Sequence, residues 1–194
     1  QDSGLFANTF DRQGAEYFLA GVRQIFEDDD LTVVNLEGPL TNSTARIDKG
    51  DPPVFWIKGR PEFINILKDS SVELANIANN HIYDYGDQGV YDTKEALAAA
   101  EIEYYGYANV FVREINDVKI GIFGFAFDSN VYNIQQQVQA LKDDGCDVVI
   151  ATFHEGHYER TYDPTSSQRA AAYAAIDAGA DLVIQHHVHN LLGI

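Results

Sequence analysis

The stretch "NIQQQVQALKDDGCDVVIATFH", residues 133–154, decides the fold class. Its first half places apolar side chains at helical spacing, and Gly145 is a typical residue to end a helix. Its second half, Cys146 to His154, is a short apolar run of the kind that forms a strand buried on both faces. A helix that leads directly into such a strand predicts one repeat of an α/β fold.

The same alternation continues in both directions along the chain. Apolar runs predict further strands over 31–37, 72–78, 118–126 and 180–187. Amphipathic segments predict helices over 15–28, 61–70, 88–100, 133–144 and 166–179, with Pro61 in a first turn and Gly179 as a helix stop. We therefore expect an α/β fold with a mostly parallel central sheet and flanking helices, interrupted by a long loop over 41–59.

Composition excludes several classes of partner. The 194 residues suit one domain, and no apolar run is long enough for a membrane helix. The net charge of −17 argues against nucleic acid and anionic membranes as partners. It also disfavours a polyanionic substrate, unless a metal or a local basic patch reverses the field. The single cysteine, Cys146, excludes an internal disulfide and is expected to be a buried thiol.

Polar side chains follow four of the five predicted strands. They include carboxylates, amides and imidazoles, which can ligate metals or transfer protons. Ligands of open α/β sheets bind beyond the carboxyl ends of the strands, so we expect these side chains to converge on one spot. They are Asn35, Glu37, Asn79, Asn80, His81, Asp84, His154, Glu155, His186, His187 and His189.

These residue types suit a metal site. His187 and His189 are two positions apart at a predicted strand end, which would point both imidazoles to the same side. Glu37 could bridge two divalent ions, Asn80 offers a neutral oxygen, and His81 could protonate a leaving oxygen. Mixed nitrogen and oxygen ligands suit zinc, manganese or iron, and a pair of such ions can clamp the attacking and leaving oxygens at phosphorus.

Each cluster alone also has an ordinary explanation. A histidine at a strand end is more often a satisfied polar residue than a ligand, and "NNH" (79–81) could be an asparagine-rich turn. The occurrence of four such clusters in this order, each behind a strand, favours the metal site over four separate explanations.

Four segments resemble one protein family. They are "DLTVVNLEGPLT", "LANIANNHIYDYGDQGVYDT", "TFHEG" and "GADLVIQHHVH", and the resemblance covers roughly residues 15–194. The chain resembles the CapA/PgsA-type poly-γ-glutamate capsule biosynthesis proteins of the calcineurin-like metallophosphoesterase superfamily. The resemblance implies a layered metallophosphoesterase-like sandwich. It also implies an extracellular or cell-surface protein, anchored in the membrane by a segment upstream, that works with the capsule polymer or its synthesis machinery.

The resemblance also implies roles for individual residues. His81 would be the catalytic histidine and Asp84 its orienting partner. The metal ligands, for one or two Mn, Zn or Fe ions, would be Glu37, Asn80, His154, His187 and His189. Four further residues would support the site, namely Asn35, Asn79, Glu155 and His186.

The chain also departs from the family pattern. The first strand of the family, which ends in Gly-Asp, and a later strand near "SLGN" have no counterpart, so we expect one domain over 1–194 that is truncated at both ends. The usual "GHHPH" is "QHHVH", with Gln185 and Val188 substituted, and the usual "HWG" is "HEG", with Glu155 in place of tryptophan.

Three functional hypotheses remain open from the sequence. The first is a metal-dependent hydrolase or transferase of the cell envelope, which acts on a phosphoester or on an amide in a polymer. The second is a non-catalytic binding or assembly component of a capsule machine. The third is a cytosolic metallophosphatase for a small nucleotide, although the chain has no glycine-rich phosphate-binding motif.

Overall fold

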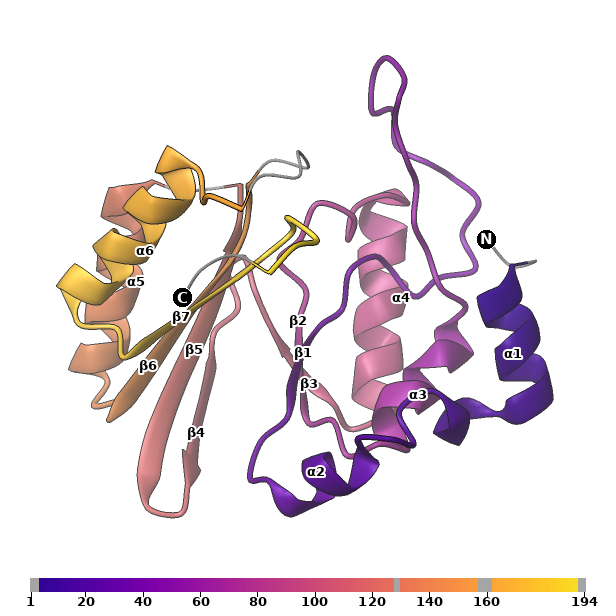
Figure 1. Ribbon diagram of the computed structural model, residues 1–194, viewed down its shortest axis with the longest axis horizontal. Helices are drawn as coiled ribbons and strands as arrows, with labels where there is room; N and C mark the ends of the chain where they lie inside the picture. The colour runs from indigo at the N-terminus through magenta and orange to yellow at the C-terminus, as the bar shows by residue number, and fades with distance from the viewer. Residues whose placement is uncertain (1–3, 128–129, 157–161, 192–194) are drawn as a thin grey trace. The chain divides into compact units, whose positions relative to one another are not determined.

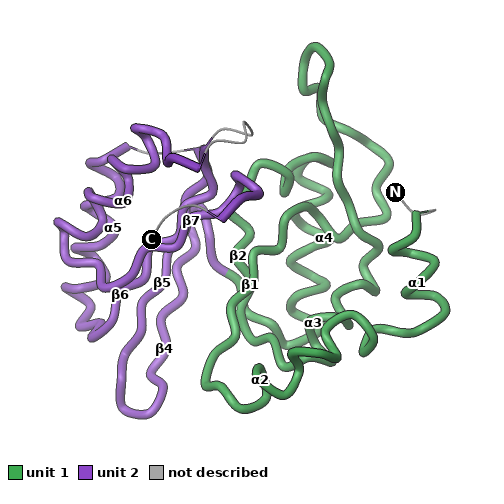
Figure 2. Tube along the Cα trace, in the orientation of Figure 1, with its two compact units in different colours: residues 1–104 green, residues 105–194 purple. Residues whose placement is uncertain are grey.

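The computed structural model describes residues 4–127, 130–156 and 162–191. The chain divides into two compact units, residues 1–104 and residues 105–194 (Figure 2). Each unit contains strands and helices, and the parallel strand pairs confirm the predicted α/β fold class. None of the helices in the described ranges is long and apolar enough to cross a membrane.

Unit 1 contains a three-stranded sheet of order β1-β2-β3. The strands are β1 (Val33–Asn35), β2 (Leu74–Asn76) and β3 (Glu103–Tyr105), and β1 runs parallel to β2. Its helices are α1 (Leu5–Gln13), α2 (Arg23–Asp28), α3 (Ile64–Lys68) and α4 (Gly86–Ala99), with short 3₁₀ helices η1 (Ala15–Tyr17) and η2 (Pro61–Phe63).

The core of unit 1 forms around β2 and α4. Leu74 and Ala75 of β2 are fully buried, as is Leu97 of α4. Thr93 of α4 is also buried, and its hydroxyl oxygen accepts a hydrogen bond from the Leu40 N–H at 2.9 Å. This bond fixes the start of the long loop to a rigid helix.

Unit 2 contains a four-stranded sheet of order β4-β5-β6-β7. Strand β4 (Phe111–Ile115) is antiparallel to β5 (Val118–Ala126), whereas β5, β6 (Val148–His154) and β7 (Leu182–His186) are parallel. Helix α5 (Val131–Asp143) connects β5 to β6, and α6 (Ser166–Ala178) connects β6 to β7. The two helices lie side by side against one face of the sheet (Figure 1), as right-handed crossovers between neighbouring strands require.

The core of unit 2 lies between these two helices and the sheet. Phe123 and Phe153 of the sheet pack with Ile134 and Val138 of α5 and with several alanines of α6. Cys146 belongs to the same core and is a free thiol, as predicted. The small side chains of α6 let that helix approach the sheet closely, and this packing fixes the strands whose ends carry the histidines.

The long loop over 41–59 contains no helix or strand, as predicted. It begins and ends at one point, where Leu40 and Gly59 form a parallel bridge. Inside the loop the Trp56 indole N–H donates to the Ile47 carbonyl at 2.9 Å, and the Lys49 ammonium donates to the Phe55 carbonyl at 2.8 Å. These bonds give the loop a defined conformation without regular secondary structure.

Some predicted elements were wrong or missed. The predicted helix over 15–28 is broken into η1, a series of turns that includes Gly21, and α2. The sequence patterns missed α1, β3 and β4. The hairpin between β4 and β5 turns at Asn116 and Asp117, whose φ angles of 51° and 64° are those of a tight two-residue hairpin turn.

Candidate functional site

The predicted site residues of unit 1 follow the ends of two paired parallel strands. Asn35 and Asn76 are register partners, and the Asn76 amide donates to the Asn35 side-chain oxygen at 3.4 Å. The Asn35 amide in turn donates to the Glu37 carboxylate at 3.3 Å. The paired strand ends therefore place the half-buried Glu37 side chain through a chain of side-chain amides.

Asn79 ties the two strand ends together. Its amide donates to the Leu36 carbonyl at 2.9 Å, and its side-chain oxygen accepts from the His81 N–H at 3.2 Å. Asn79 is 1% exposed, so both bonds lie out of contact with solvent. The neighbouring Asn80 is half-buried. Asn79 thus links the segment that carries Glu37 to the segment that carries His81.

His81 and Asp84 form a buried pair. The His81 Nδ1 atom lies 2.8 Å from an Asp84 carboxylate oxygen, and the exposed fractions of the two residues are 4% and 0%. A carboxylate accepts hydrogen bonds and does not donate them, so this bond places a proton on Nδ1 and leaves Nε2 for other partners. This geometry agrees with the orienting role that the resemblance implies for Asp84.

Lys49 joins this pair and was missed by the sequence analysis. Its ammonium forms an ion pair with Asp84 and lies 3.4 Å from His81 Nδ1. Asp84 also accepts a hydrogen bond from the Ile57 N–H at 2.7 Å. One buried carboxylate therefore orients the histidine and holds two points of the long loop. No local motif marks Lys49, because it lies far from His81 in sequence.

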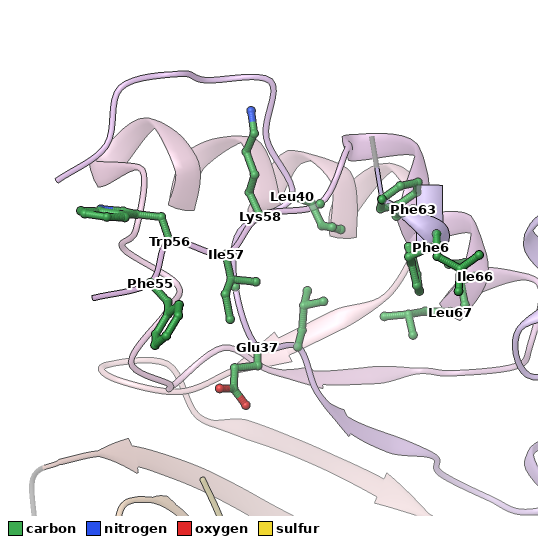
Figure 3. Close-up of a pocket in the computed structure, with 15 residues that line it drawn as sticks. Phe6, Glu37, Leu40, Phe55, Trp56, Ile57, Lys58, Phe63, Ile66 and Leu67 are labelled. Atoms are coloured by element: carbon green, nitrogen blue, oxygen red, sulfur yellow. The ribbon is translucent and has the colours of Figure 1, made fainter. Parts of the chain in front are cut away.

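A large pocket lies beside Glu37. It has a volume of about 720 Å³ and is mostly apolar, with Leu36, Phe55 and Ile57 among its walls. Figure 3 shows Phe55 and Ile57 on the side of the loop on which Glu37 lies, while Lys58 extends to the opposite side. An apolar wall beside a carboxylate strengthens the electrostatic interactions of that carboxylate, because it lowers the local dielectric constant.

The predicted site residues of unit 2 gather at the carboxyl ends of three parallel strands. The strand register aligns Ala126 of β5, His154 of β6 and His186 of β7. His154 is fully buried and Glu155, the next residue, is 5% exposed. Within this unit, the strand ends bring the histidine of the "HEG" segment next to the first histidine of the "QHHVH" segment.

The imidazole rings of unit 2 form a connected cluster. The ring centroids of His154 and His187 are 5.0 Å apart, and those of His154 and His186 are 6.2 Å apart. One ring nitrogen of His154 lies within 4.8 Å of one of His187. Two imidazoles that share a tetrahedral zinc ion place their nitrogens about 3.4 Å apart, so His154 and His187 are candidates to bind one ion together.

The predicted reason for the proximity of His187 and His189 was wrong. Strand β7 ends at His186, so alternation along a strand does not place the two side chains. Instead both residues adopt left-handed backbone, with φ angles of 93° and 54°, and their ring centroids are 6.4 Å apart. Left-handed backbone is uncommon for residues other than glycine, although histidine adopts it more often than most, and it occurs at turns and at functional sites. His187 is buried, whereas His189 is exposed.

Phe127 is a second residue that the sequence analysis missed. Its ring packs edge-on against His187, with centroids 4.9 Å apart, and lies 6.4 Å from the ring of His154.

Burial lowers the pKa of His186, the residue before His187, which favours the neutral imidazole. The neutral form is the one that binds metal ions.

Gly156 fits the cluster for a steric reason. Its φ angle is 129°, and a Cβ atom at this position would lie 2.5 Å from Val188 and 2.9 Å from Gln168. Glycine is required here because the segment that carries His187 and His189 passes so close. The "HEG" and "QHHVH" segments are thus complementary in shape.

The structure leaves one part of the prediction untested. Within unit 1 it brings together Asn35, Glu37, Asn79, His81 and Asp84, and within unit 2 it brings together His154, His186, His187 and His189. The convergence of all four clusters on one spot stays a prediction from the sequence.

Comparison with known proteins assigns the family. The family model of the bacterial capsule synthesis protein PGA_cap matches residues 4–194. The capsule biosynthesis protein CapA of Bacillus anthracis and the PGA biosynthesis protein CapA of Bacillus subtilis are each 28% identical over 207 residues, which cover 93% of this chain and 50% and 53% of theirs.

A probable polyglutamine synthesis accessory protein of Mycobacterium tuberculosis is 26% identical over 195 residues, which cover 83% of this chain and 50% of that protein. The chain spans about half the length of these relatives. The family match over nearly the whole chain agrees with the resemblance carried by the four sequence motifs, and the chain belongs to the bacterial capsule synthesis protein PGA_cap family.

Proposed function

We propose that this chain is the metal-binding part of a protein that takes part in capsule polymer synthesis at the bacterial cell envelope. In this proposal it acts on a phosphoester or an amide bond of the poly-γ-glutamate polymer or its precursor. It either hydrolyses that bond or transfers the released group to another acceptor. The names of the relatives support the capsule role. The observation that carries the chemistry is the buried pair of imidazoles, His154 and His187, at the carboxyl ends of parallel strands.

The side chains fit a divalent metal. His154 and His187 offer nitrogen ligands in a buried environment, and His189 stands beside His187. The sequence pattern adds Glu37 and Asn80 as the oxygen ligands. This mixed donor set suits Zn, Mn or Fe better than calcium or magnesium. When bound, the metal would supply a Lewis acid that stabilises negative charge on a reacting oxygen.

His81 is the proposed proton carrier. Asp84 accepts a hydrogen bond from the Nδ1 proton, which leaves Nε2 as the atom that faces the substrate. When the ring is doubly protonated, Nε2 gives the second proton to a leaving oxygen, and the ring returns to the neutral form with its proton on Nδ1. Lys49 adds a positive charge next to this pair, which partly neutralises Asp84. Because the pair is buried, its hydrogen bond also fixes the orientation of the imidazole ring.

An activity assay tests this function. The chelated protein should release no product from p-nitrophenyl phosphate or from γ-linked glutamate polymer, and Mn²⁺ or Zn²⁺ should restore turnover. His81→Ala should lower the rate by roughly 10²- to 10⁴-fold while the metal content stays unchanged. Asp87→Asn, on the exposed start of α4, is the matched control and should behave as wild type.

Two outcomes would contradict the catalytic proposal. One is turnover that does not depend on added metal, and the other is full activity in His81→Ala. A second experiment uses a bacterial strain from which the gene for this protein has been deleted. If the protein turns over no substrate, but wild type and His81→Ala restore capsule formation in that strain equally, the chain is an assembly component instead.

A further inference from the structure

The long loop carries an excess of positive charge in an acidic protein. Residues 41–60, which are the long loop and the residue that follows it, contain four basic residues, Arg46, Lys49, Lys58 and Arg60, and two acidic ones, Asp48 and Asp51. The whole chain has 13 basic and 30 acidic residues. The loop is therefore the local basic patch that a polyanionic partner of this protein would need.

Two of these four cations form ion pairs with carboxylates. Lys49 is paired with Asp84, and Arg60 is paired with Asp11 and Glu62. Within the described ranges, neither Arg46 nor Lys58 forms an ion pair. Instead the Arg46 guanidinium lies 5.3 Å from the centre of the Trp56 ring, and the Lys58 ammonium lies 5.0 Å from the centre of the Tyr85 ring. Stacking on an aromatic ring positions a cation without cancelling its charge.

These two cations line one pocket. Its volume is about 430 Å³, and its walls are Thr44, Arg46, Val54, Phe55, Trp56, Lys58 and Tyr85. None of these wall residues carries a carboxylate. Phe55 is 69% exposed, so an apolar ring stands beside the two charges. The pocket thus offers positive charge next to apolar surface.

The pocket is held in place by backbone contacts. The Lys58 ammonium donates to the Ser43 carbonyl at 2.8 Å, which leaves further N–H groups of the ammonium for a ligand. The Trp56 indole is fixed to Ile47, and the Ile57 N–H is fixed to Asp84. Asp84 also orients His81, so one buried residue connects the pocket to the proposed proton carrier.

We propose that this pocket binds the carboxylates of an anionic glutamyl chain. Arg46 and Lys58 would pair with the carboxylates, and the rings of Phe55 and Trp56 would pack against the methylene groups of the chain. The two charges make the pocket suited to an acid, and the apolar rings favour a carboxylate on a hydrocarbon chain over a bare phosphate chain. This assignment rests on the proposed function for the identity of the polymer.

Trp56 makes the proposal directly testable, because it is the one tryptophan of the chain. Metal-free protein is titrated at low salt with a γ-linked glutamate decamer while tryptophan fluorescence is followed. We expect a saturable change that weakens as salt is added. The double variant Arg46→Gln/Lys58→Gln should bind at least about ten-fold more weakly.

The matched control is Lys94→Gln/Arg113→Gln. These two cations also stack on aromatic rings, Tyr104 and Phe111, but neither lines the pocket, so the double variant removes the same charge elsewhere. It should bind the decamer as wild type does. Equal weakening in both double variants would show that only the net charge matters, and would overturn the proposal.

Further outcomes separate the ligand classes. An inorganic polyphosphate of equal charge should bind more weakly than the decamer, and equal or tighter binding would make the pocket a general anion site and overturn the carboxylate assignment. His187→Ala should bind the decamer normally, since it lies outside the pocket. Binding without metal or turnover would support this pocket even if the proposed catalysis failed, and unchanged fluorescence would refute the pocket alone.

Discussion

At the scale of single residues, Asp84 connects His81 to the long loop of unit 1. It is fully buried and contacts His81, Lys49 and the Ile57 N–H. In the sequence analysis, the family resemblance implied that Asp84 is the orienting partner of His81. It could not place Lys49 or Ile57 there, since these contacts depend on the path of a loop without periodic structure.

Asp84→Asn should destabilise unit 1 and release His81. Removing one member of a buried ion pair leaves the Lys49 charge without its partner, which costs about 3 kcal/mol in the free energy of unfolding. Urea unfolding measures this loss, and nitrogen NMR of the imidazole should show that Nδ1 no longer holds its proton predominantly. Asp87→Asn is the surface control, and equal stability of the two variants would contradict the role given to Asp84.

Gly156→Ala tests the close packing of the histidine segment. The new methyl group would meet Val188 at 2.5 Å, and the backbone would be strained by its positive φ. Gly145→Ala is the control because Gly145 also has a positive φ, 81°, but has no atom within 4 Å of its would-be Cβ. Backbone strain alone should lower the free energy of unfolding of the Gly145→Ala control by about 1 kcal/mol.

In Gly156→Ala the free energy of unfolding should fall by about 1–3 kcal/mol more than in this control. The variant should also bind metal more weakly, because the clash displaces Val188, which lies between His187 and His189. Urea unfolding and metal titration measure the two effects. Equal destabilisation of both variants would show that the contact with Val188 is unimportant.

At the scale of elements, the predictions succeeded where the sequence pattern was long and regular. Strand β5 has the predicted bounds, and helices α4, α5 and α6 lie within two residues of theirs. Strands β1 and β2 lie within longer apolar runs, whereas β3 ("EYY") and β4 ("FVREI") contain charged residues and were missed, although Asn116-Asp117 was an available turn signal. The turn that carries His187 and His189 depends on tertiary contacts with Gly156, which no local pattern shows.

Asp181 connects three elements of unit 2. It stands directly before β7, and its carboxylate accepts from the Lys142 ammonium of α5 and from the Val149 N–H of β6, both at 2.8 Å. The Lys142 hydrogen bond, with that of Val149, lowers the pKa of Asp181 below its usual value. Because the pKa of Asp181 is lower in the folded than in the unfolded protein, its charged carboxylate stabilises the fold at pH values above the unfolded-state pKa. This stabilisation is lost as the pH falls through the folded-state pKa.

Asp181→Asn should therefore be less stable than wild type by at most about 1 kcal/mol at pH 7, because the Asp181 side chain is 46% exposed and solvent screens its ion pair with Lys142. The two proteins should approach equal stability as the pH falls below about 4, the ordinary pKa of an aspartate in the unfolded chain, and on through the lower pKa of the folded carboxylate. Urea unfolding at several pH values measures this convergence. If the difference in stability between the two proteins is the same at pH 7 and at the lowest pH measured, the charge of Asp181 contributes nothing to stability.

At the scale of the whole molecule, the account rests on two sets of side chains, one in each unit. Unit 1 supplies the His81–Asp84 pair, and unit 2 supplies the buried imidazole cluster. The strongly acidic surface would repel an anionic polymer, so a metal and a basic loop are the two features that would let such a polymer approach. The central claim of the account is thus that the imidazoles of unit 2 bind a divalent metal ion.

The most direct test is the metal content of protein purified without a chelator or a histidine tag. We expect about one to two Zn, Mn or Fe ions per chain by mass spectrometry. His154→Ala and His187→Ala should lose that metal while remaining folded, whereas Gln139→Ala, on the exposed face of α5, should keep it. Wild-type protein that holds no metal after equilibration with all three ions, or variants that retain it in full, would contradict the account.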